Sequence, residues 1–287
     1  MKEFIRKENA SHRLMSTMAD NGVLLLEYPL LNSTNVVSHC FTTRIGGVSE
    51  GYYGSLNLNF NNGDNPDAIS ENYRRLAAAK GWNVENMVLS WQTHTTNIRK
   101  VTREDAGKGI VTTRDYQDID GLITNEPGLV LSTLYADCVP LYFVDPVHKA
   151  IGLSHSGWKG TVNRIGKVTI EAMAREYGTL PSDLVCAIGP SICQDCYEVS
   201  LDVAEAFMKE FPLNTDDILY EKEPVNGERK FQLNLWKACE TVLIDAGVKP
   251  ENIAVTDICT CCNPELLFSH RASHGKRGNL GAFLCLL

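Results

Sequence analysis

The sequence predicts an α+β fold with mixed, largely antiparallel sheets. Strand-length apolar runs rich in β-branched residues alternate with helix-period segments along all 287 residues. Short turns join most of the predicted strands, whereas a doubly wound parallel sheet needs a helix crossover between neighbouring strands. No repeat, low-complexity tract or linker divides the chain, so residues 1–287 are expected to form a single domain, with residues 1–20 as a peripheral segment.

The first half of the chain is predicted to form strands and one amphipathic helix. The predicted strands are residues 23–27, 36–43, 87–91, 98–101 and 120–124. The helix begins after Asn65, a favoured N-cap, with Pro66 in its first turn, and it ends at Gly81. Residues 43–64 are rich in Gly, Ser and Asn and too long for a simple linker, which is typical of functional loops.

The second half is predicted to add helices and two more strands. The spacing of Val162, Ile165 and Met173 indicates a helix that ends at Gly178. Ser200 and Asn234 are expected to cap two further helices, the second ending at Gly247. The strands are residues 184–188 and 253–258, and the polar residues 221–230, with Asn226-Gly227, are expected to form a surface hairpin loop.

Composition narrows the class of partner. A formal net charge of −8 argues against broad contact with nucleic acid or an anionic membrane. No apolar run has the length of a transmembrane helix, and residues 23–31 are interrupted by Glu27 and Pro29. The charged N-terminus has no apolar segment after it, so no signal peptide is expected and the cytoplasm is the expected location. Most of the ten cysteines are then expected to be reduced and buried.

Residues 129–160 are expected to be the centre of the fold. Two long apolar runs flank a turn at residues 145–149, which indicates a hairpin. If Asp145 pairs with Ala150, then Pro140 faces His155. Cys138 then shares a sheet face with His155, at a diagonal distance of roughly 7–8 Å. A slip of one residue would turn one of the two side chains away.

Three residues at predicted strand ends are candidate metal ligands: His94, Cys138 and His155. Two imidazoles and one thiolate form a known kind of catalytic zinc site, with a fourth position open for water or substrate. Two other interpretations fit the same residues. They are satisfied core histidines beside a buried thiol, or a cysteine–histidine hydrolase with Cys138 as nucleophile and His155 as base.

Five further cysteines suggest a second metal site: Cys193, Cys196, Cys259, Cys261 and Cys262. Together they could hold a structural zinc ion. We interpret the second cluster as lacking the two-residue gap that lets two sulfurs face one metal, so we expect Cys193 and Cys259 simply to pack. A separate set of cations in Gly-rich or polar segments could bind phosphate: Arg44, Lys159, Arg271, Lys276 and Arg277.

Seven motifs occur in an order that resembles the YfiH/YlmD family, also called the polyphenol-oxidoreductase laccase or purine nucleoside phosphorylase family. They are TRIGGVS (43–49), QTH (92–94), DGLIT (120–124), ADCVP (136–140), HSGWKG (155–160), IGPSIC (188–193) and FSHR (268–271). The resemblance extends from about residue 23 to the C-terminus. Together the motifs are specific, although each alone would be a weak signal.

The resemblance implies a four-layer α/β/β/α sandwich of the YfiH type, with zinc held by His94, Cys138 and His155. It implies a purine nucleoside phosphorylase of broad specificity, acting on adenosine, inosine, guanosine and methylthioadenosine, with adenosine deaminase activity. Inorganic phosphate is then the second substrate, and a monomer is expected. A non-enzymatic zinc-stabilised binding module is the remaining alternative.

The laccase name implies copper as the alternative cofactor. A multicopper oxidase needs several clustered sites and a histidine-rich ligand set, but this chain has seven histidines, with His12, His39 and His148 in unrelated segments. The His94, Cys138 and His155 set offers one metal position. The sequence therefore favours zinc.

Phosphorolysis requires groups that hold a phosphate dianion beside the sugar, and we expect Arg44 and Arg271 to do this. Lys159 stands where the family usually has arginine, so it keeps the charge but loses the guanidinium fork. Deamination needs a carboxylate for proton transfer, and Asp137 is the candidate. Because strand neighbours point to opposite faces, Asp137 is more readily interpreted as a support for the backbone.

Overall fold

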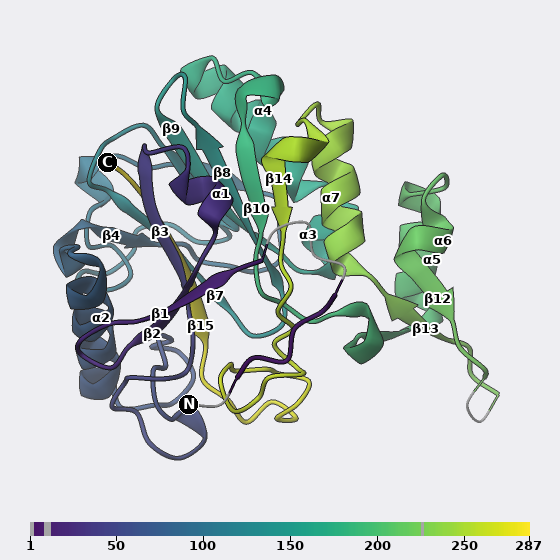
Figure 1. Ribbon diagram of the computed structural model, residues 1–287, viewed down its shortest axis with the longest axis horizontal. Coiled ribbons are helices and arrows are strands. Elements are labelled where there is room, and N and C mark those ends of the chain that lie inside the picture. Colours follow the sequence, from purple (N-terminus) through teal and green to yellow (C-terminus); the bar gives the residue numbers. More distant parts are fainter. Residues whose placement is uncertain (1–2, 9–12, 225–226) are drawn as a thin grey trace.

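Two six-stranded sheets form the centre of the protein (Figure 1). The computed structural model describes residues 3–8, 13–224 and 227–287. Most strand pairs in these residues are antiparallel, and the parallel pairs are β4 with β7, β5 with β6 and β10 with β14. The predicted mixed and largely antiparallel α+β class is therefore confirmed.

The first sheet has the order β1-β2-β3-β15-β7-β4 and the second β14-β10-β8-β9-β6-β5. The strands of the first sheet are β1 (Met15–Met18), β2 (Leu24–Glu27), β3 (Val37–Thr42), β4 (Met87–Leu89), β7 (Val130–Tyr135) and β15 (Leu280–Leu286). Those of the second are β5 (Ile98–Lys100), β6 (Gly121–Thr124), β8 (Val139–Asp145), β9 (Ala150–Ser156), β10 (Val185–Ile188) and β14 (Ile253–Val255). A separate small sheet consists of β11 (Glu198–Ser200), β12 (Leu219–Glu221) and β13 (Lys230–Leu233).

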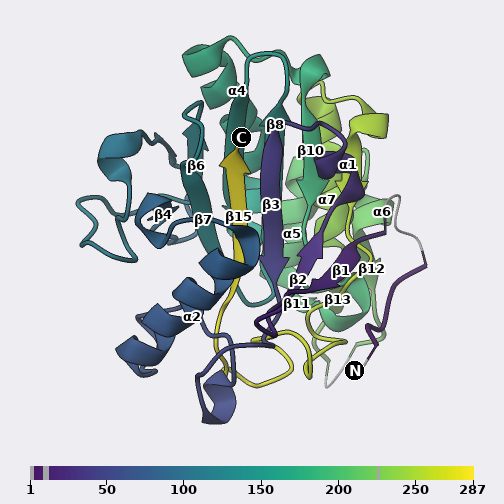
Figure 2. The same cartoon turned by 60° about the vertical axis from the view of Figure 1, so that its left-hand side comes forward.

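Helices cover the outer faces of both large sheets. The α-helices of the described residues are α1 (Pro29–Asn32), α2 (Pro66–Lys80), α3 (Trp158–Val162), α4 (Ile165–Tyr177), α5 (Leu201–Glu210), α6 (Thr215–Ile218) and α7 (Leu235–Asp245). The helices that cover the two sheets include α2, α4 and α7. Helix α2 lies against the first sheet, across β15 and β3 in Figure 2, while α4 and α7 lie beyond the second sheet (Figures 1 and 2). This arrangement is the four-layer α/β/β/α sandwich.

The strand pattern explains the layers. Successive side chains of a strand point to opposite faces, and both faces of β8 are buried. Leu141 and Phe143 pack with residues of α4 and α7, whereas Tyr142 and Val144 join the core between the two sheets. A third cluster packs α2 against the outer face of the first sheet. The four layers therefore enclose three apolar interfaces.

The register of the central hairpin is as predicted. Asp145 pairs with Ala150, and Pro140 pairs with His155. The first apolar run differs from the prediction, because it forms two strands, β7 in the first sheet and β8 in the second. The chain passes from one sheet to the other at residues 136–138, where Asp137 has a positive φ of 92°.

Helix boundaries largely follow the predicted capping residues. Asn65 accepts a hydrogen bond from the Asp67 amide at the start of α2, and Gly81 ends that helix in the left-handed conformation. Asn234 caps α7 in the same way through Lys237. The helix predicted from Val162 to Gly178 is two helices, α3 and α4, because Arg164 between them is left-handed with φ 56°.

The remaining segments lie at the periphery. The small sheet stands beside α5 and α6 at one side of the molecule (Figure 1). Strands β12 and β13 flank the predicted hairpin loop, in which residues 225–226 lie outside the described part of the chain. None of the described helices is both long enough and apolar enough to cross a bilayer.

The core between the sheets predicts a large difference between two leucine truncations. Leu131 in β7 is fully buried in this core, whereas Leu213 is 95% exposed. Leu131→Ala is expected to lower the free energy of unfolding by about 2–5 kcal/mol, because it removes packed atoms and leaves a cavity. Leu213→Ala, the matched control, should change it by less than about 0.5 kcal/mol. Urea denaturation measures both, and equal shifts in the midpoint would contradict this assignment of the core.

Candidate active site

Cys138 lies where the chain passes between the two sheets. Strand β7 ends at Tyr135, Ala136 and Asp137 form a turn, and Cys138 is the last residue before β8. The positive φ of Asp137 makes this turn sharp, since few non-glycine residues adopt that conformation. The thiol is thereby held at the edge of the sandwich and half-buried.

His155 lies in β9, and its ring orientation is set by a buried carboxylate. Its Nδ1 donates to Oδ1 of Asp120 at 2.8 Å, and its backbone amide donates to the Asp120 carbonyl at 2.7 Å. Asp120 is fully buried at the start of β6. The bond at Nδ1 leaves Nε2 of His155 as the ligand atom, the usual arrangement of a carboxylate–histidine–metal site.

The same carboxylate holds the loop that carries His94. Oδ1 of Asp120 accepts from the His94 amide at 3.1 Å, and Oδ2 accepts from the Thr93 amide at 3.1 Å and the Thr95 amide at 2.8 Å. The Thr95 hydroxyl adds a bond of 2.9 Å. These bonds stabilise His94 in a left-handed conformation with φ 66°. Asp120 therefore places two of the three predicted ligands.

The three side chains can hold one metal ion. One ligand atom from each of His94, Cys138 and His155 lies within 4.8 Å of the others, with 3.9 Å between the Cys138 Sγ and His94 Nε2. Gly157 leaves room for this cluster, because a Cβ there would lie 2.8 Å from His94 Cδ2 and 3.2 Å from the Cys138 Sγ. Two imidazoles and one thiolate suit zinc and leave a coordination position open.

The ionisable side chains of the site shift one another's pKa values. Burial raises the pKa of the Cys138 thiol, but the imidazoles of His155 and His94 outweigh it and lower this pKa to about 6. Burial lowers the pKa of His155, yet Cys138 and Asp120 raise it to about 9. Burial also opposes ionisation of Asp120, whose hydrogen bonds nevertheless lower its pKa to about 2. The site favours a thiolate at neutral pH, the form that binds a metal.

A cleft of about 530 Å³ opens in front of these ligands. This volume lies within the usual range for small-molecule sites. Besides the ligands, its lining includes amides, cations and aromatic rings: Asn59, Asn61, Gln92, Asn279, Arg114, His270, Arg271, Arg277, Trp91 and Tyr197. An adjoining hollow of about 250 Å³ shares His94, Cys138 and Asp137 with it.

Of the three residues predicted to bind phosphate, two line the cleft or the hollow beside it and one does not. Arg271 lines the main cleft, and Lys159 lines the adjoining hollow with its Nζ 5.6 Å from the centroid of the Trp158 ring. Arg44 lines neither, because its guanidinium donates to the carbonyls of Gly54 and Pro264 and stacks 4.6 Å from the Phe268 ring centroid.

Asp137 is occupied by contacts to the long segment between β14 and β15. Its Oδ1 accepts from the Thr260 hydroxyl at 2.6 Å, and its Oδ2 accepts from the Arg271 amide at 2.7 Å. Its backbone carbonyl accepts from the Ile192 amide at 3.0 Å. The residue beside Cys138 thus positions the cleft wall that carries Arg271.

Sequence reasoning missed the role of Asp120. Its signal was an acidic residue at the start of a buried strand, where an unpaired carboxylate would be strongly unfavourable. It also missed Trp91, Arg114, Tyr197 and Asn279, which come from separate segments and carry no local motif. Arg277 was considered only as one of several cations. Asn59 and Asn61 belong to the Gly- and Asn-rich loop predicted to be functional.

The chain is similar to known proteins over most of its length. The family model of the multi-copper polyphenol oxidoreductase laccases matches residues 38–287. The chain is 36% identical over 248 residues to the purine nucleoside phosphorylase YlmD of Bacillus subtilis, covering 85% of this chain and 86% of the relative. It is 41% identical over 259 residues to a purine nucleoside phosphorylase of Deinococcus radiodurans, covering 90% and 93%. The crystal structure of the hypothetical protein YfiH of Bacillus licheniformis matches with a TM-score of 0.85 at 32% identity, covering 95% of this chain and 99% of that one.

The close approach at Gly157 predicts that one added methyl group disturbs the metal ligands. Gly157→Ala is expected to weaken zinc binding at least about tenfold, because its Cβ overlaps the His94 ring and crowds the Cys138 sulfur. Titration with zinc and a competing chelator measures this change. Gly160→Ala is the matched control, since a Cβ there meets its nearest atom at 3.5 Å. Equal affinities for the two variants would contradict the proposed packing.

The pKa of Cys138 predicts its reactivity in protein stripped of metal with a chelator. Because this pKa is lowered to about 6, alkylation by iodoacetamide should stay fast at pH 7 and slow as the pH falls through 6. An ordinary thiol would slow already below about pH 8.5. Peptide-resolved mass spectrometry measures the rate at Cys138, and added zinc should protect it. A midpoint near 8.5 would contradict the coupling to His155.

Proposed function

This chain belongs to the multi-copper polyphenol oxidoreductase laccase family, and from that premise we propose that it is a zinc-dependent purine nucleoside phosphorylase. The relatives named as purine nucleoside phosphorylases support an enzyme of this kind. The single observation that carries the proposal is the convergence of His94, Cys138 and His155 at the wall of a cleft lined by arginines and aromatic rings.

His94, Cys138 and His155 would hold the zinc ion, and Asp120 would fix the tautomer of His155. When bound, zinc supplies Lewis-acid stabilisation of negative charge at an open coordination position. The family's description names a multicopper oxidase, but the ligand chemistry of this chain favours zinc, because a laccase needs clustered histidine sites. Among the described residues the candidate metal groups are this one and a set of four cysteines.

Phosphate would bind at Arg271 and Arg277, which both line the cleft. Arg271 donates through its two terminal nitrogens to the carbonyls of Cys196 and Glu198, at 3.2 and 3.0 Å. A guanidinium has five N–H donors, so donors remain for a phosphate oxygen. Held there, the phosphate can attack the anomeric carbon as the purine departs from an oxocarbenium-like sugar (the transition state of glycoside hydrolysis is similar).

The base and sugar would contact the aromatic and amide groups of the cleft. Trp91 is 39% exposed and offers a face for stacking, while Asn59, Asn61 and Asn279 offer hydrogen bonds to hydroxyl groups. Stacking of a base on the Trp91 ring does not depend on the substituents that distinguish one purine from another. We therefore extend the proposal to adenosine, inosine, guanosine and methylthioadenosine.

The proposal also includes adenosine deamination, which needs a carboxylate for proton transfer. Asp137 is the one carboxylate among the described residues that line the cleft and the adjoining hollow. Both of its oxygens already accept hydrogen bonds from Thr260 and Arg271. Asp137 is therefore better suited to position Arg271 than to transfer a proton, and the described lining residues offer deamination no unengaged carboxylate.

A cysteine–histidine hydrolase is the second candidate, because one observation favours it. The opposed pKa shifts of Cys138 and His155 describe a thiolate beside an imidazolium, the charge state of a cysteine nucleophile. This reading needs neither zinc nor phosphate. The two functions are therefore separable by experiment.

The decisive measurement is the release of hypoxanthine from inosine with and without phosphate. Release is expected only with phosphate and to produce ribose 1-phosphate. A chelator should abolish it, and zinc should restore it better than copper. Cys138→Ser should lower kcat/KM by about 100-fold or more, since removing a ligand has a larger effect than the 10–100-fold typical of a hydrogen-bonded partner.

Cys261→Ser is the matched control, because Cys261 is a half-buried cysteine outside the three-ligand group. It should leave phosphorolysis unchanged. Equal release without phosphate, insensitive to the chelator but abolished in Cys138→Ser, would identify the hydrolase instead.

A further inference from the structure

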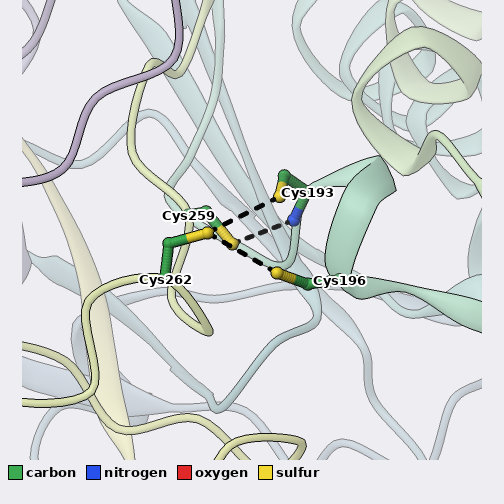
Figure 3. A group of neighbouring side chains, drawn as sticks. All are labelled: Cys193, Cys196, Cys259 and Cys262. Atoms are coloured by element: carbon green, nitrogen blue, oxygen red, sulfur yellow. Dashed lines mark hydrogen bonds between the residues drawn. The ribbon is translucent and has the colours of Figure 1, made fainter.

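A second cluster of sulfur atoms, from Cys193, Cys196, Cys259 and Cys262, lies where two loops meet (Figure 3). Cys193 precedes and Cys196 ends a short 3₁₀ turn after β10, and Cys259 and Cys262 lie in the segment after β14. All four sulfur atoms lie within 4.8 Å of one another. The pairs Cys196–Cys262 and Cys193–Cys262 are 3.5 and 4.0 Å apart.

These distances suit a tetrahedral metal ion. Zinc–sulfur bonds of about 2.3 Å at tetrahedral angles place sulfur atoms about 3.8 Å apart. A disulfide bond would be about 2.05 Å long, and among the described residues all ten cysteines are free. The arrangement therefore fits four ligands around one central ion.

The spacing of the second cysteine pair in the sequence is not the one assumed in our sequence prediction. Cys193 and Cys196 form one CxxC pair, and Cys259 and Cys262 form a second, so both loops have the two-residue gap of zinc sites. The prediction that these residues merely pack overlooked this gap, because Cys261 stands between the members of the second pair. Cys261 itself lies outside the group of four.

The surroundings distinguish this cluster from ordinary buried thiols. Cys40, Cys186, Cys239 and Cys285 lie singly in strands or helices of the core, whereas these four converge from two loops. The backbone amide of Cys193 donates to the Cys259 sulfur at 3.2 Å, a contact that supports a thiolate. Lys7 is also close to the cluster. Its Nζ donates to Oδ2 of Asp195 at 2.9 Å, and Asp195 lies between Cys193 and Cys196 in the sequence.

We propose that Cys193, Cys196, Cys259 and Cys262 bind one structural zinc ion. Four protein ligands leave no open position, which distinguishes this site from the three-ligand group in the cleft. The site is separate from the proposed phosphorylase chemistry.

The ion would anchor the segment that carries part of the cleft wall. The described residues 256–279 contain no helix and only isolated bridges, yet they bring His270, Arg271 and Arg277 to the cleft. Beside the cysteines, a hydrogen bond joins this segment to the loop that carries Cys193 and Cys196. The Thr260 amide donates to the Ser191 carbonyl at 3.0 Å. Arg271 also donates to the carbonyl of the ligand Cys196. A metal clip between the two loops would hold this otherwise irregular wall in place.

Metal analysis of purified full-length variants tests the proposal. Cys262→Ser is expected to contain one zinc equivalent fewer than the native protein and to unfold at a lower temperature. Cys261→Ser, a substitution of the neighbouring cysteine, should retain the native zinc content. The variant Cys138→Ser, which leaves the four cysteines intact, should still contain one zinc equivalent, and Cys138→Ser with Cys262→Ser should contain none.

These outcomes separate the two metal sites. Loss of zinc in Cys138→Ser but not in Cys262→Ser would overturn the four-cysteine site and leave the proposed phosphorylase untouched. If Cys262→Ser fails to fold, the zinc content of Cys138→Ser decides alone, since absence of zinc there overturns the proposal. Iron in place of zinc, or a Cys196–Cys262 disulfide found by peptide mapping of protein purified without oxidant, would also overturn it.

Discussion

The buried carboxylate of Asp120 is the constraint on which the candidate active site depends. It has no exposed surface, and it accepts hydrogen bonds from the His155 ring and from the backbone around His94. A carboxylate offers about four acceptor positions, so it can satisfy all of these donors at once. Without them a buried negative charge would be strongly unfavourable. One side chain therefore orients one imidazole and shapes the loop that presents the other.

The passage of the chain between the two sheets determines where this chemistry takes place. Residues 136–138 leave β7 in one sheet and enter β8 in the other, so Cys138 lies at the edge of the sandwich and not within a layer. The neighbouring Asp137 binds Thr260 and Arg271 of the long segment after β14. The same turn thus presents a candidate metal ligand and supports the wall of the cleft.

The two groups of candidate ligands follow different physical designs. In the group of His94, Cys138 and His155, one residue lies in strand β9 and two lie in a loop and a turn, and the buried Asp120 carboxylate orients the histidines. Its three candidate ligands leave room for a substrate atom. The four cysteines join two irregular loops, with a closed set of ligands. Irregular segments have few ladder hydrogen bonds of their own, so a metal clip is an effective way to order them. The cleft is lined both by the group of His94, Cys138 and His155 and by residues of the segment that carries Cys259 and Cys262.

Much of the secondary structure could be predicted from the sequence, because its causes are local. Asn65 begins and Gly81 ends α2 as expected, and the turn after Asp145 has the register expected from it, which pairs Pro140 with His155. The motifs indicated the family. The sequence could not show that β7 and β8 belong to different sheets, since both read as one apolar run. Nor could it show that Asp120 joins two candidate ligands, that Arg44 binds the carbonyls of Gly54 and Pro264 and does not line the cleft, or that Cys259 and Cys262 meet Cys193 and Cys196. Each of these depends on contacts between residues far apart in the chain, and only the packing of the sheets and loops brings them together.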